Sequence, residues 1–153
     1  MEITNRDLTI TRLIDAPPEA VFKCWTTPSL ITQWFTPPPY ETIRAEIDLR
    51  PGGSSLITMR SPEGVEIPNP GIYLEVIPNQ KIVATDAYTS AWELADKPFM
   101  TLILTFENVN GKTQYTAIAR HWSVADREAH ENMGFHTGWG IATDQLAALA
   151  ATL

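Results

Sequence analysis

The sequence predicts an α+β domain in which a curved antiparallel sheet of about six or seven strands wraps around one long C-terminal helix. Apolar and polar residues alternate in segment after segment between residues 43 and 122, which indicates strands with one buried face. Turn residues separate these segments. The end of the chain instead repeats apolar residues at helical spacing, and only this helix is long enough to cover the buried face of the sheet.

A first strand and two short helices are expected before the main run of strands. Residues 8–14 alternate apolar and polar side chains over much of their length, which predicts the strand. Pro17 and Pro18 suit the first turn of a helix, because the N–H groups there have no partner within the helix. Apolar residues at helical spacing then predict helices over about 18–26 and 28–35, and the run Pro37-Pro38-Pro39 ends the second one.

Further strands follow, each bounded by turn residues. They are predicted over residues 43–49, 54–60, 65–77, 81–88, 100–106 and 113–122. Pro51-Gly52-Gly53 and Asn110-Gly111 supply the turn chemistry of two hairpins. Pro68 and Pro70 cannot donate a ladder hydrogen bond, so the strand that contains them must bulge or lie at an edge there. Residues 89–97, which include Trp92, are expected to form a loop.

The final segment predicts one continuous helix of about 28 residues, ~42 Å long. Ser123 and Asp126 have the spacing of an N-terminal capping box. The apolar stripe that follows consists of Phe135, Trp139, Ala142, Leu146, Leu149 and Leu153. Gly134, Gly138 and Gly140 interrupt this pattern, and each costs about 0.8–1 kcal/mol in a helix interior. We therefore expect a large group to pass close to the helix backbone at these glycines.

Composition narrows the possible classes of protein. A chain of 153 residues fits one domain spanning 1–153, and 44% apolar residues is a value typical of globular proteins. No apolar run approaches the ~18 residues needed to span a bilayer, and residues 1–7 have neither the basic start nor the apolar core of a signal peptide. We therefore expect a cytoplasmic protein with no membrane partner.

Charge and cysteine content exclude further kinds of site. The net charge is −7 and the basic residues form no cluster, so nucleic acid is not expected as a partner. Cys24 is the only cysteine, which excludes an internal disulfide and a thiolate-rich metal site. His130 and His136 are six positions apart, on opposite sides of the predicted helix, and cannot share a metal ion. We expect no metal and no cofactor.

Five short motifs, in a fixed order, indicate a family. They are Asp15-Ala16-Pro17 with Val21-Phe22 and Trp25, Pro28-x-Leu30 with Trp34, Asp48-Leu49-Arg50-Pro51-Gly52-Gly53, Gly71-x-Tyr73-x-Glu75-Val76, and Gly138-Trp139 with Leu146. In order and spacing the chain resembles the SRPBCC (START-like, helix-grip) superfamily, in particular the group named after the activator of the Hsp90 ATPase. The chain departs from the pattern at Phe35, where many relatives carry a second tryptophan, and in the loop around Trp92.

The resemblance implies a helix-grip fold with a deep cavity between the sheet and the long helix, partly closed by the two short helices. Members of the superfamily bind hydrophobic or amphipathic small molecules there, or catalyse cyclisation and dehydration of polyketides. We expect a non-enzymatic protein that binds a hydrophobic or aromatic small molecule in a cavity of a few hundred Å³. The alternatives are a cyclase-like or dehydratase-like enzyme, and, by analogy with the eukaryotic namesakes, a module that binds an Hsp90-type chaperone. A homodimer through the sheet edge or the helix is also possible.

Bulky side chains are the candidates for lining such a cavity, although any single one could instead fill a packed core. The predicted ligand-binding residues are Trp25, Trp34, Phe35, Met59, Tyr73, Trp92, Phe99, Trp122, Met133, His136 and Trp139. For the enzyme alternative, the candidate acids or bases are His136, Tyr73 and Asp86. Asp86 is included because it shares a strand face with Ile82 and Ala84.

Overall fold

The computed structural model describes residues 3–90 and 93–153, which form nine strands and four helices. In chain order these are β1 (Asp7–Ile14), α1 (Pro18–Thr26), α2 (Pro28–Trp34), β2 (Glu41–Ile47), β3 (Ser54–Arg60), β4 (Glu66–Ile77), β5 (Lys81–Thr85), β6 (Tyr88–Ser90), β7 (Glu93–Leu94), β8 (Met100–Val109), β9 (Lys112–His121), α3 (Val124–Asn132) and α4 (Phe135–Ala150).

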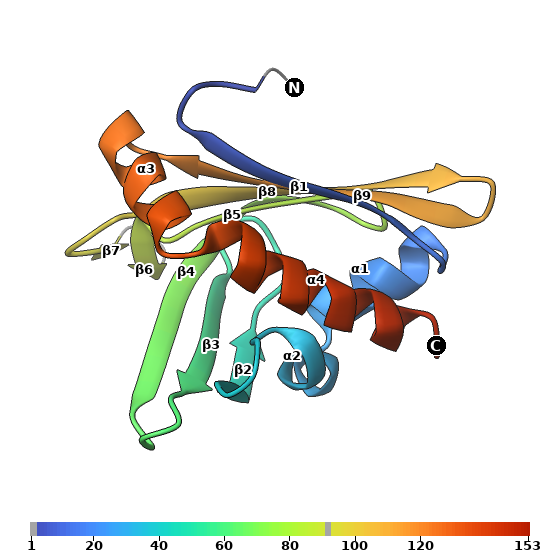
Figure 1. Ribbon diagram of the computed structural model, residues 1–153, viewed down its shortest axis with the longest axis horizontal. Helices are drawn as coiled ribbons and strands as arrows, with labels where there is room; N and C mark the ends of the chain where they lie inside the picture. Colours follow the sequence, from blue (N-terminus) through green and yellow to red (C-terminus); the bar gives the residue numbers. More distant parts are fainter. Residues whose placement is uncertain (1–2, 91–92) are drawn as a thin grey trace.

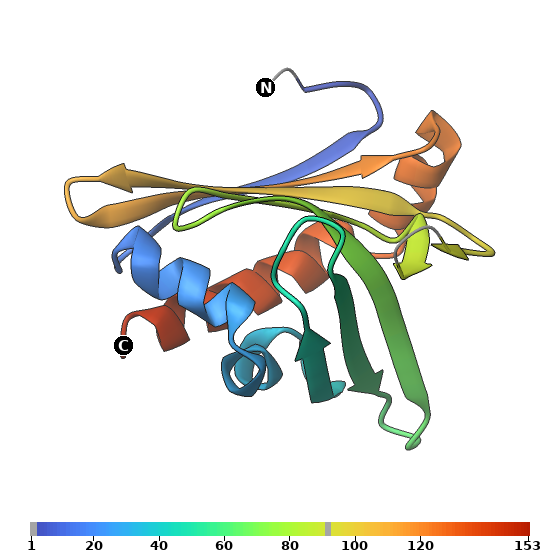
Figure 2. The ribbon, with the colours of Figure 1, turned by 180° about the vertical axis from the view of Figure 1, so that it is seen from behind.

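Seven strands form one antiparallel sheet in the order β1-β9-β8-β5-β4-β3-β2. In Figure 1, β1, β9, β8 and β5 form an upper layer, and β4, β3 and β2 turn away from it, so that the sheet bends around α4. Seen from behind, α1 and α2 lie on the same inner side as α4 (Figure 2). The predicted α+β helix-grip fold is thus confirmed.

Two details of the strands differ from the expectation or refine it. The strand predicted over 81–88 ends at Thr85, and the predicted loop over 89–97 overlaps a small two-stranded sheet of β6 and β7. Pro68 and Pro70 pair with β3, whereas β5 pairs with residues 72–77 of β4. The two prolines therefore lie in the half of β4 that extends beyond β5, where a missing N–H is tolerated.

The single C-terminal helix predicted from the apolar stripe is wrong, because the chain forms two helices there. The capping interaction at Ser123 is present, since its Oγ accepts a hydrogen bond from the N–H of Asp126 at 3.1 Å. α3 then ends before Gly134, whose φ of 93° is left-handed and cannot continue a helix. Every side chain of α3 stays at least partly exposed in the described structure, and the buried stripe starts at Phe135.

The glycines of α4 do not mark the close approach of a large group. At Gly138, no described atom lies within 4 Å of the position that a Cβ would take, and at Gly140 only the Arg12 guanidinium comes near, at 3.5 Å. One close backbone approach is instead in the sheet. A Cβ on Gly71 would lie 2.7 Å from the carbonyl oxygen of Thr85, so β4 and β5 meet there without room for a side chain.

The core lies between the sheet and the inner helices. α1 buries five apolar or aromatic side chains besides its first proline, and α4 buries Phe135, Ala142, Leu146 and Ala150. Two buried indoles are fixed by hydrogen bonds: Trp25 Nε1 donates to the Tyr115 hydroxyl at 3.2 Å, and Trp34 Nε1 donates to the carbonyl of Cys24 at 3.0 Å. The indole of α1 that faces the remaining space, Trp25, and the indole of α2 behind it, Trp34, are therefore held in place.

Candidate ligand cavity

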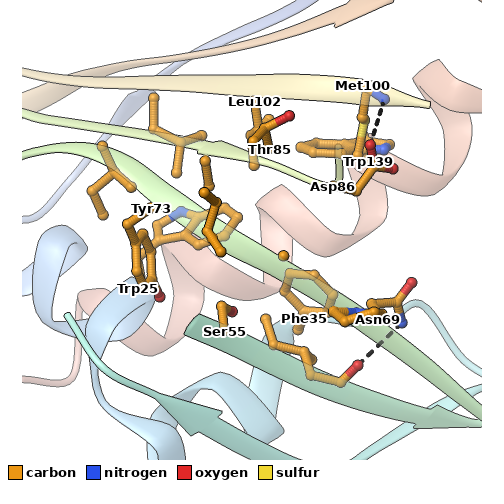
Figure 3. A pocket seen from close by; sticks show the side chains of 17 residues that line it. Trp25, Phe35, Ser55, Asn69, Tyr73, Thr85, Asp86, Met100, Leu102 and Trp139 are labelled. Carbon is orange, nitrogen blue, oxygen red and sulfur yellow. Dashed lines mark hydrogen bonds between the residues drawn. The ribbon is translucent and has the colours of Figure 1, made fainter. Parts of the chain in front are cut away.

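A cavity of about 140 Å³ lies between the bent sheet, α4 and the short helices (Figure 3). It is smaller than the few hundred Å³ expected from the sequence. Its walls come from α1, the end of α2, α4, and strands β3, β4, β5 and β8. Apolar cavities of about this volume can stay dry and accept one benzene ring. The space therefore suits a single ring.

The alternation of β5 and β8 produces the apolar floor of the cavity. Ile82 pairs with Leu104, and Ala84 pairs with Leu102. Because side chains alternate between the two faces of a strand, all four point to the same side of the sheet. Ile82 and Leu104 are buried, whereas Ala84 and Leu102 are partly exposed. The floor thus becomes more open along the strands.

Aromatic side chains from three helices and one strand complete the walls. Trp25 on α1 and Tyr73 on β4 are buried at the inner end, and Phe35 and Trp139 are only half-buried. In Figure 3, Trp25 and Tyr73 lie at one end of the cavity, and Trp139 and Phe35 lie toward the other. The cavity is therefore closed by aromatic rings at its inner end and opens near Trp139.

Asp86 is the one charged residue among the described residues that line the cavity. It follows β5 directly, and its Oδ1 accepts hydrogen bonds from the backbone N–H groups of Phe99 at 2.8 Å and Met100 at 3.0 Å. These two bonds fix the carboxylate at the start of β8. In Figure 3, Asp86 lies next to Met100 and Trp139, at the open end of the cavity.

The other polar groups of the lining are mostly engaged within the protein. Asn69 donates its amide hydrogens to the carbonyls of Ile57 and Ile67, both at 3.2 Å, which leaves its side-chain oxygen as an acceptor. Burial raises the pKa of the Tyr73 hydroxyl, and a hydrogen bond with Ser55 offsets part of this rise. Tyr73 is therefore a neutral phenol around neutral pH.

Four of the residues predicted to bind a ligand line the cavity: Trp25, Phe35, Tyr73 and Trp139. Trp34 lies behind them, buried and with its ring centroid 4.7 Å from that of Trp25. Met59 is on β3, paired with Thr42 and Ile67, outside the lining.

Four further predicted residues, all within the described part of the chain, are not brought to the cavity. Trp122 is 50% exposed and Met133 is 77% exposed, because both lie beside α3 rather than on α4. The side chain of His136 is 59% exposed and lies 3.6 Å from Glu131. Phe99 packs against two histidine rings instead of the cavity. Trp92 lies outside the described residues.

Several lining residues were not among the predicted ligand-binding set. Apart from Asp86, they are Ser55, Ile57, Asn69, Pro70, Gly71, Ile72, Ile82, Ala84, Thr85, Met100, Leu102 and Leu104. A signal for part of this set is present in the sequence, because Met100, Leu102 and Leu104 alternate cleanly with polar residues. The same periodicity places Asp86 on the face of Ile82 and Ala84, and all three line the cavity.

A second aromatic cluster supports the open end of the cavity from outside. Phe135 stacks on Trp139 with ring centroids 5.3 Å apart and an interplanar angle of 26°. On its other side Phe135 contacts His130 at 5.0 Å, and Phe99 contacts both His130 and His121. The wall residue Trp139 is thus connected through Phe135 to a pair of histidines, of which His121 is buried and His130 is half-buried.

Across residues 3–90 and 93–153, no three His, Cys, Asp or Glu side chains come together in a way that could hold a metal ion. None of the helices in these ranges has the length and apolar content required to cross a membrane.

Comparison with known proteins identifies relatives of this arrangement. Residues 15–151 match the family described as Activator of Hsp90 ATPase homolog 1-like protein. The comparison with curated proteins gives no match.

Solved structures of bacterial proteins have the same fold. A protein of Nitrosomonas europaea has 34% sequence identity and a TM-score of 0.94, over 99% of this chain and 97% of its own. A protein of Staphylococcus epidermidis has 26% identity and a TM-score of 0.79, over 99% and 93% of the two chains. A protein of Rhodobacter sphaeroides, at 20% identity, has a TM-score of 0.86 over 100% and 97% and shows the fold alone.

Proposed function

This chain belongs to the family of Activator of Hsp90 ATPase homolog 1-like proteins, and we propose that it binds a hydrophobic small molecule with a single ring between the sheet and α4. The observation that carries the proposal is the cavity of about 140 Å³, whose lining is mainly aliphatic and aromatic. A ligand pocket typically combines an apolar wall with a few fixed polar groups. Asp86, Asn69 and Tyr73 are such groups here.

The size of the cavity sets the expected affinity. One aromatic ring buries on the order of 150–250 Å², which at about 25 cal/mol per Å² contributes roughly 4–6 kcal/mol. Part of this is offset by the loss of translational and rotational freedom on binding. A plain ring such as toluene is therefore expected to bind weakly, with a Kd on the order of 1 mM.

The test is a titration of the isotope-labelled protein with toluene, followed by NMR of the methyl groups. We expect shifts at Ile82, Ala84, Leu102 and Leu104, whose methyl groups line the cavity. The variant Ala84→Leu fills the space and should lose these shifts, because added methylenes occupy the volume that the ring needs. Ala129→Leu, at an exposed position of α3, is the matched control and should bind as the wild type does. The absence of cavity shifts in the wild type at saturating toluene would refute the proposal.

Acid–base catalysis in the same cavity is the second candidate function. Two of the three residues that the sequence indicates as acids or bases, Asp86 and Tyr73, line the cavity, whereas His136 lies on the surface. Conversion of a bound ligand would appear as a new product in its NMR spectrum and should be lost in Asp86→Asn. If the ligands that bind in the cavity are not converted to a product, the non-enzymatic function is favoured. Homodimer formation and contact with an Hsp90-type chaperone stay predictions.

A further inference from the structure

We propose that the ligand of this cavity is an arylalkylamine: a single aromatic ring joined by a short carbon chain to an ammonium group that binds Asp86. This inference rests on the proposed function, since it names the chemical class of the molecule that the cavity takes. It follows from three features of the lining, which are the sign of its charge, the hydrogen bonding of the carboxylate, and the separation of apolar and polar ends.

The first feature is the sign of the charge. Among the lining residues that the structure describes, Asp86 carries a negative charge and no lysine, arginine or histidine is present. The chain as a whole has a net charge of −7. A carboxylate or phosphate ligand would lose its hydration here without gaining a cationic partner. An ammonium group gains one.

The second feature is the hydrogen bonding of the Asp86 side chain. Its Oδ1 accepts the N–H groups of Phe99 and Met100, at 2.8 and 3.0 Å. Its Oδ2 has no hydrogen-bond partner in residues 3–90 or 93–153. The carboxylate is thus already oriented by the protein and keeps one oxygen for a donor. A charge-assisted hydrogen bond to a fixed carboxylate is stronger than one between neutral groups.

The third feature is the arrangement of the lining. The inner end is formed by buried side chains such as Trp25, Tyr73 and Leu104, and Asp86 and Asn69 lie at the more exposed end (Figure 3). A ring at the inner end therefore leaves its substituent near Asp86. The half-buried ring of Trp139 lies beside Asp86 in the same view, and an indole face attracts a cation. An amphipathic molecule with one ring and one cationic end matches this order of groups.

The experiment compares ligands of matched shape by isothermal titration calorimetry at pH 7. The set is 2-phenylethylamine, 2-phenylethanol and phenylacetate, with toluene as the probe of the ring site. We expect the amine to bind about tenfold more tightly than the alcohol, as a hydrogen bond to a charged group predicts, and phenylacetate to bind more weakly than either. This preference should decrease as salt is added.

The variant Asp86→Asn isolates the charge, because an asparagine oxygen can still accept from Phe99 and Met100. It should bring the affinity for the amine down to that for the alcohol. Glu63→Gln, in the exposed turn between β3 and β4, removes one negative charge elsewhere and should keep the preference for the amine.

The outcomes separate this inference from the proposed function. If toluene binds but the wild type binds the amine no better than the alcohol, the inference is overturned and the proposed function stands. Tighter binding of phenylacetate would overturn it as well. If no ligand of the set, toluene included, produces heat or cavity shifts, the proposed function itself fails and takes the inference with it. The wild-type comparison decides these cases even if Asp86→Asn does not fold.

Discussion

Nε2 of His121 lies 2.8 Å from Nδ1 of His130, and Nδ1 of His121 lies 2.8 Å from the carbonyl oxygen of Arg6. A carbonyl only accepts, so this hydrogen-bond network assigns the His121 proton to Nδ1 and leaves Nε2 as an acceptor. His130 then donates from Nδ1. The two imidazoles together connect α3 to β9 and to the segment before β1.

Stability should therefore depend on the protonation of His130. Burial, and after it the charge of His121, lower the pKa of His130 from 6.5 to about 4. Between these values the unfolded chain binds a proton that the folded protein does not, so the free energy of unfolding should rise with pH from about 4 to 6.5. The steepest slope for one such group is about 1.4 kcal/mol per pH unit, and partial exposure should limit the total to roughly 1–2 kcal/mol.

The measurement is urea unfolding of wild type and His130→Asn at several pH values from 4.5 to 7. The asparagine offers an N–H to His121 but does not titrate. The two proteins share every other ionisable group, including Glu131, which is next to His130 and in contact with His136, so the difference between the two slopes reports on His130. Equal pH dependence in the two proteins would contradict the assignment of a neutral, half-buried His130.

Two glycines near the helix break should respond to alanine in opposite directions. Gly134 has a φ of 93°, which disfavours any side chain, and Gly134→Ala should destabilise the fold by about 1–2 kcal/mol. Gly138 lies within α4, with no described atom within 4 Å of a new Cβ. Gly138→Ala should stabilise by about 0.5–1 kcal/mol, because alanine loses less conformational entropy in a helix. Thermal unfolding of the two variants measures both effects, and a loss of stability in Gly138→Ala would show that its site is crowded.

The Asp7–Arg120 pair should be a stabilising contact between the first and last strands. Asp7 accepts from Nε and Nη2 of Arg120, both at 2.9 Å, and from the N–H of Thr4 at 2.8 Å. Burial of Asp7 alone would raise its pKa. The hydrogen bonds from Arg120 and Thr4, together with the positive charge of Arg120, outweigh this effect, so the pKa of Asp7 is lowered. The stabilisation is then present above the ordinary pKa of 3.8 and is lost as the pH falls below it.

Asp7→Asn should cost about 2–3 kcal/mol at pH 7, somewhat less than a fully buried pair, because Arg120 keeps partial access to water. Its effect should shrink as the pH falls below 3.8, because the unfolded wild-type chain then takes up a proton at Asp7 that the paired carboxylate of the folded protein resists. Asp15→Asn is the control, since Asp15 is exposed and its nearest contact to Lys112 is 4.0 Å. Denaturation at pH 7 and at pH 3 tests this, and a cost for Asp7→Asn that does not change with pH would rule out the ionised pair.

The parts of the fold that depend on local periodicity could be predicted from the sequence. Alternation defines β5 and β8 and places Ile82, Leu104 and Asp86 on one face, and that face became the floor of the cavity. The end of α3 could not be predicted, because a glycine is compatible with a weak helix interior and with a helix end. Only the left-handed φ of Gly134 distinguishes the two.

The helix break at Gly134 also explains why some of the predicted ligand-binding residues lie away from the cavity. In a continuous helix, Met133 would be near the stripe that contains Trp139. With the chain turning at Gly134, Met133 is 77% exposed and His136 lies near Glu131. The hydrogen bond between His121 and His130 joins two elements across this region, and no spacing rule relates a strand residue to a residue of the following helix. Contacts of this kind depend on tertiary packing alone.

Alanine substitutions at two tryptophans should distinguish a side chain that forms the cavity wall from one that is packed in the core. Trp34 is 3% exposed and packs against Trp25 and Phe35, so Trp34→Ala should cost about 3–5 kcal/mol. Trp139 is half-buried and borders the cavity. Trp139→Ala should cost less, about 1–2 kcal/mol, because part of its surface faces empty space rather than packed atoms.

The same substitution should change which ligands fit. Removing the indole of Trp139 enlarges a cavity that takes one ring, so Trp139→Ala should bind the two-ring compound naphthalene more tightly than wild type does. A fluorescent two-ring probe, displaced by naphthalene, measures this, and Trp34→Ala serves as the control that removes an indole outside the lining. An unchanged preference for one ring in Trp139→Ala, or a loss of stability equal to that of Trp34→Ala, would mean that Trp139 is packed on all sides and does not form the cavity wall.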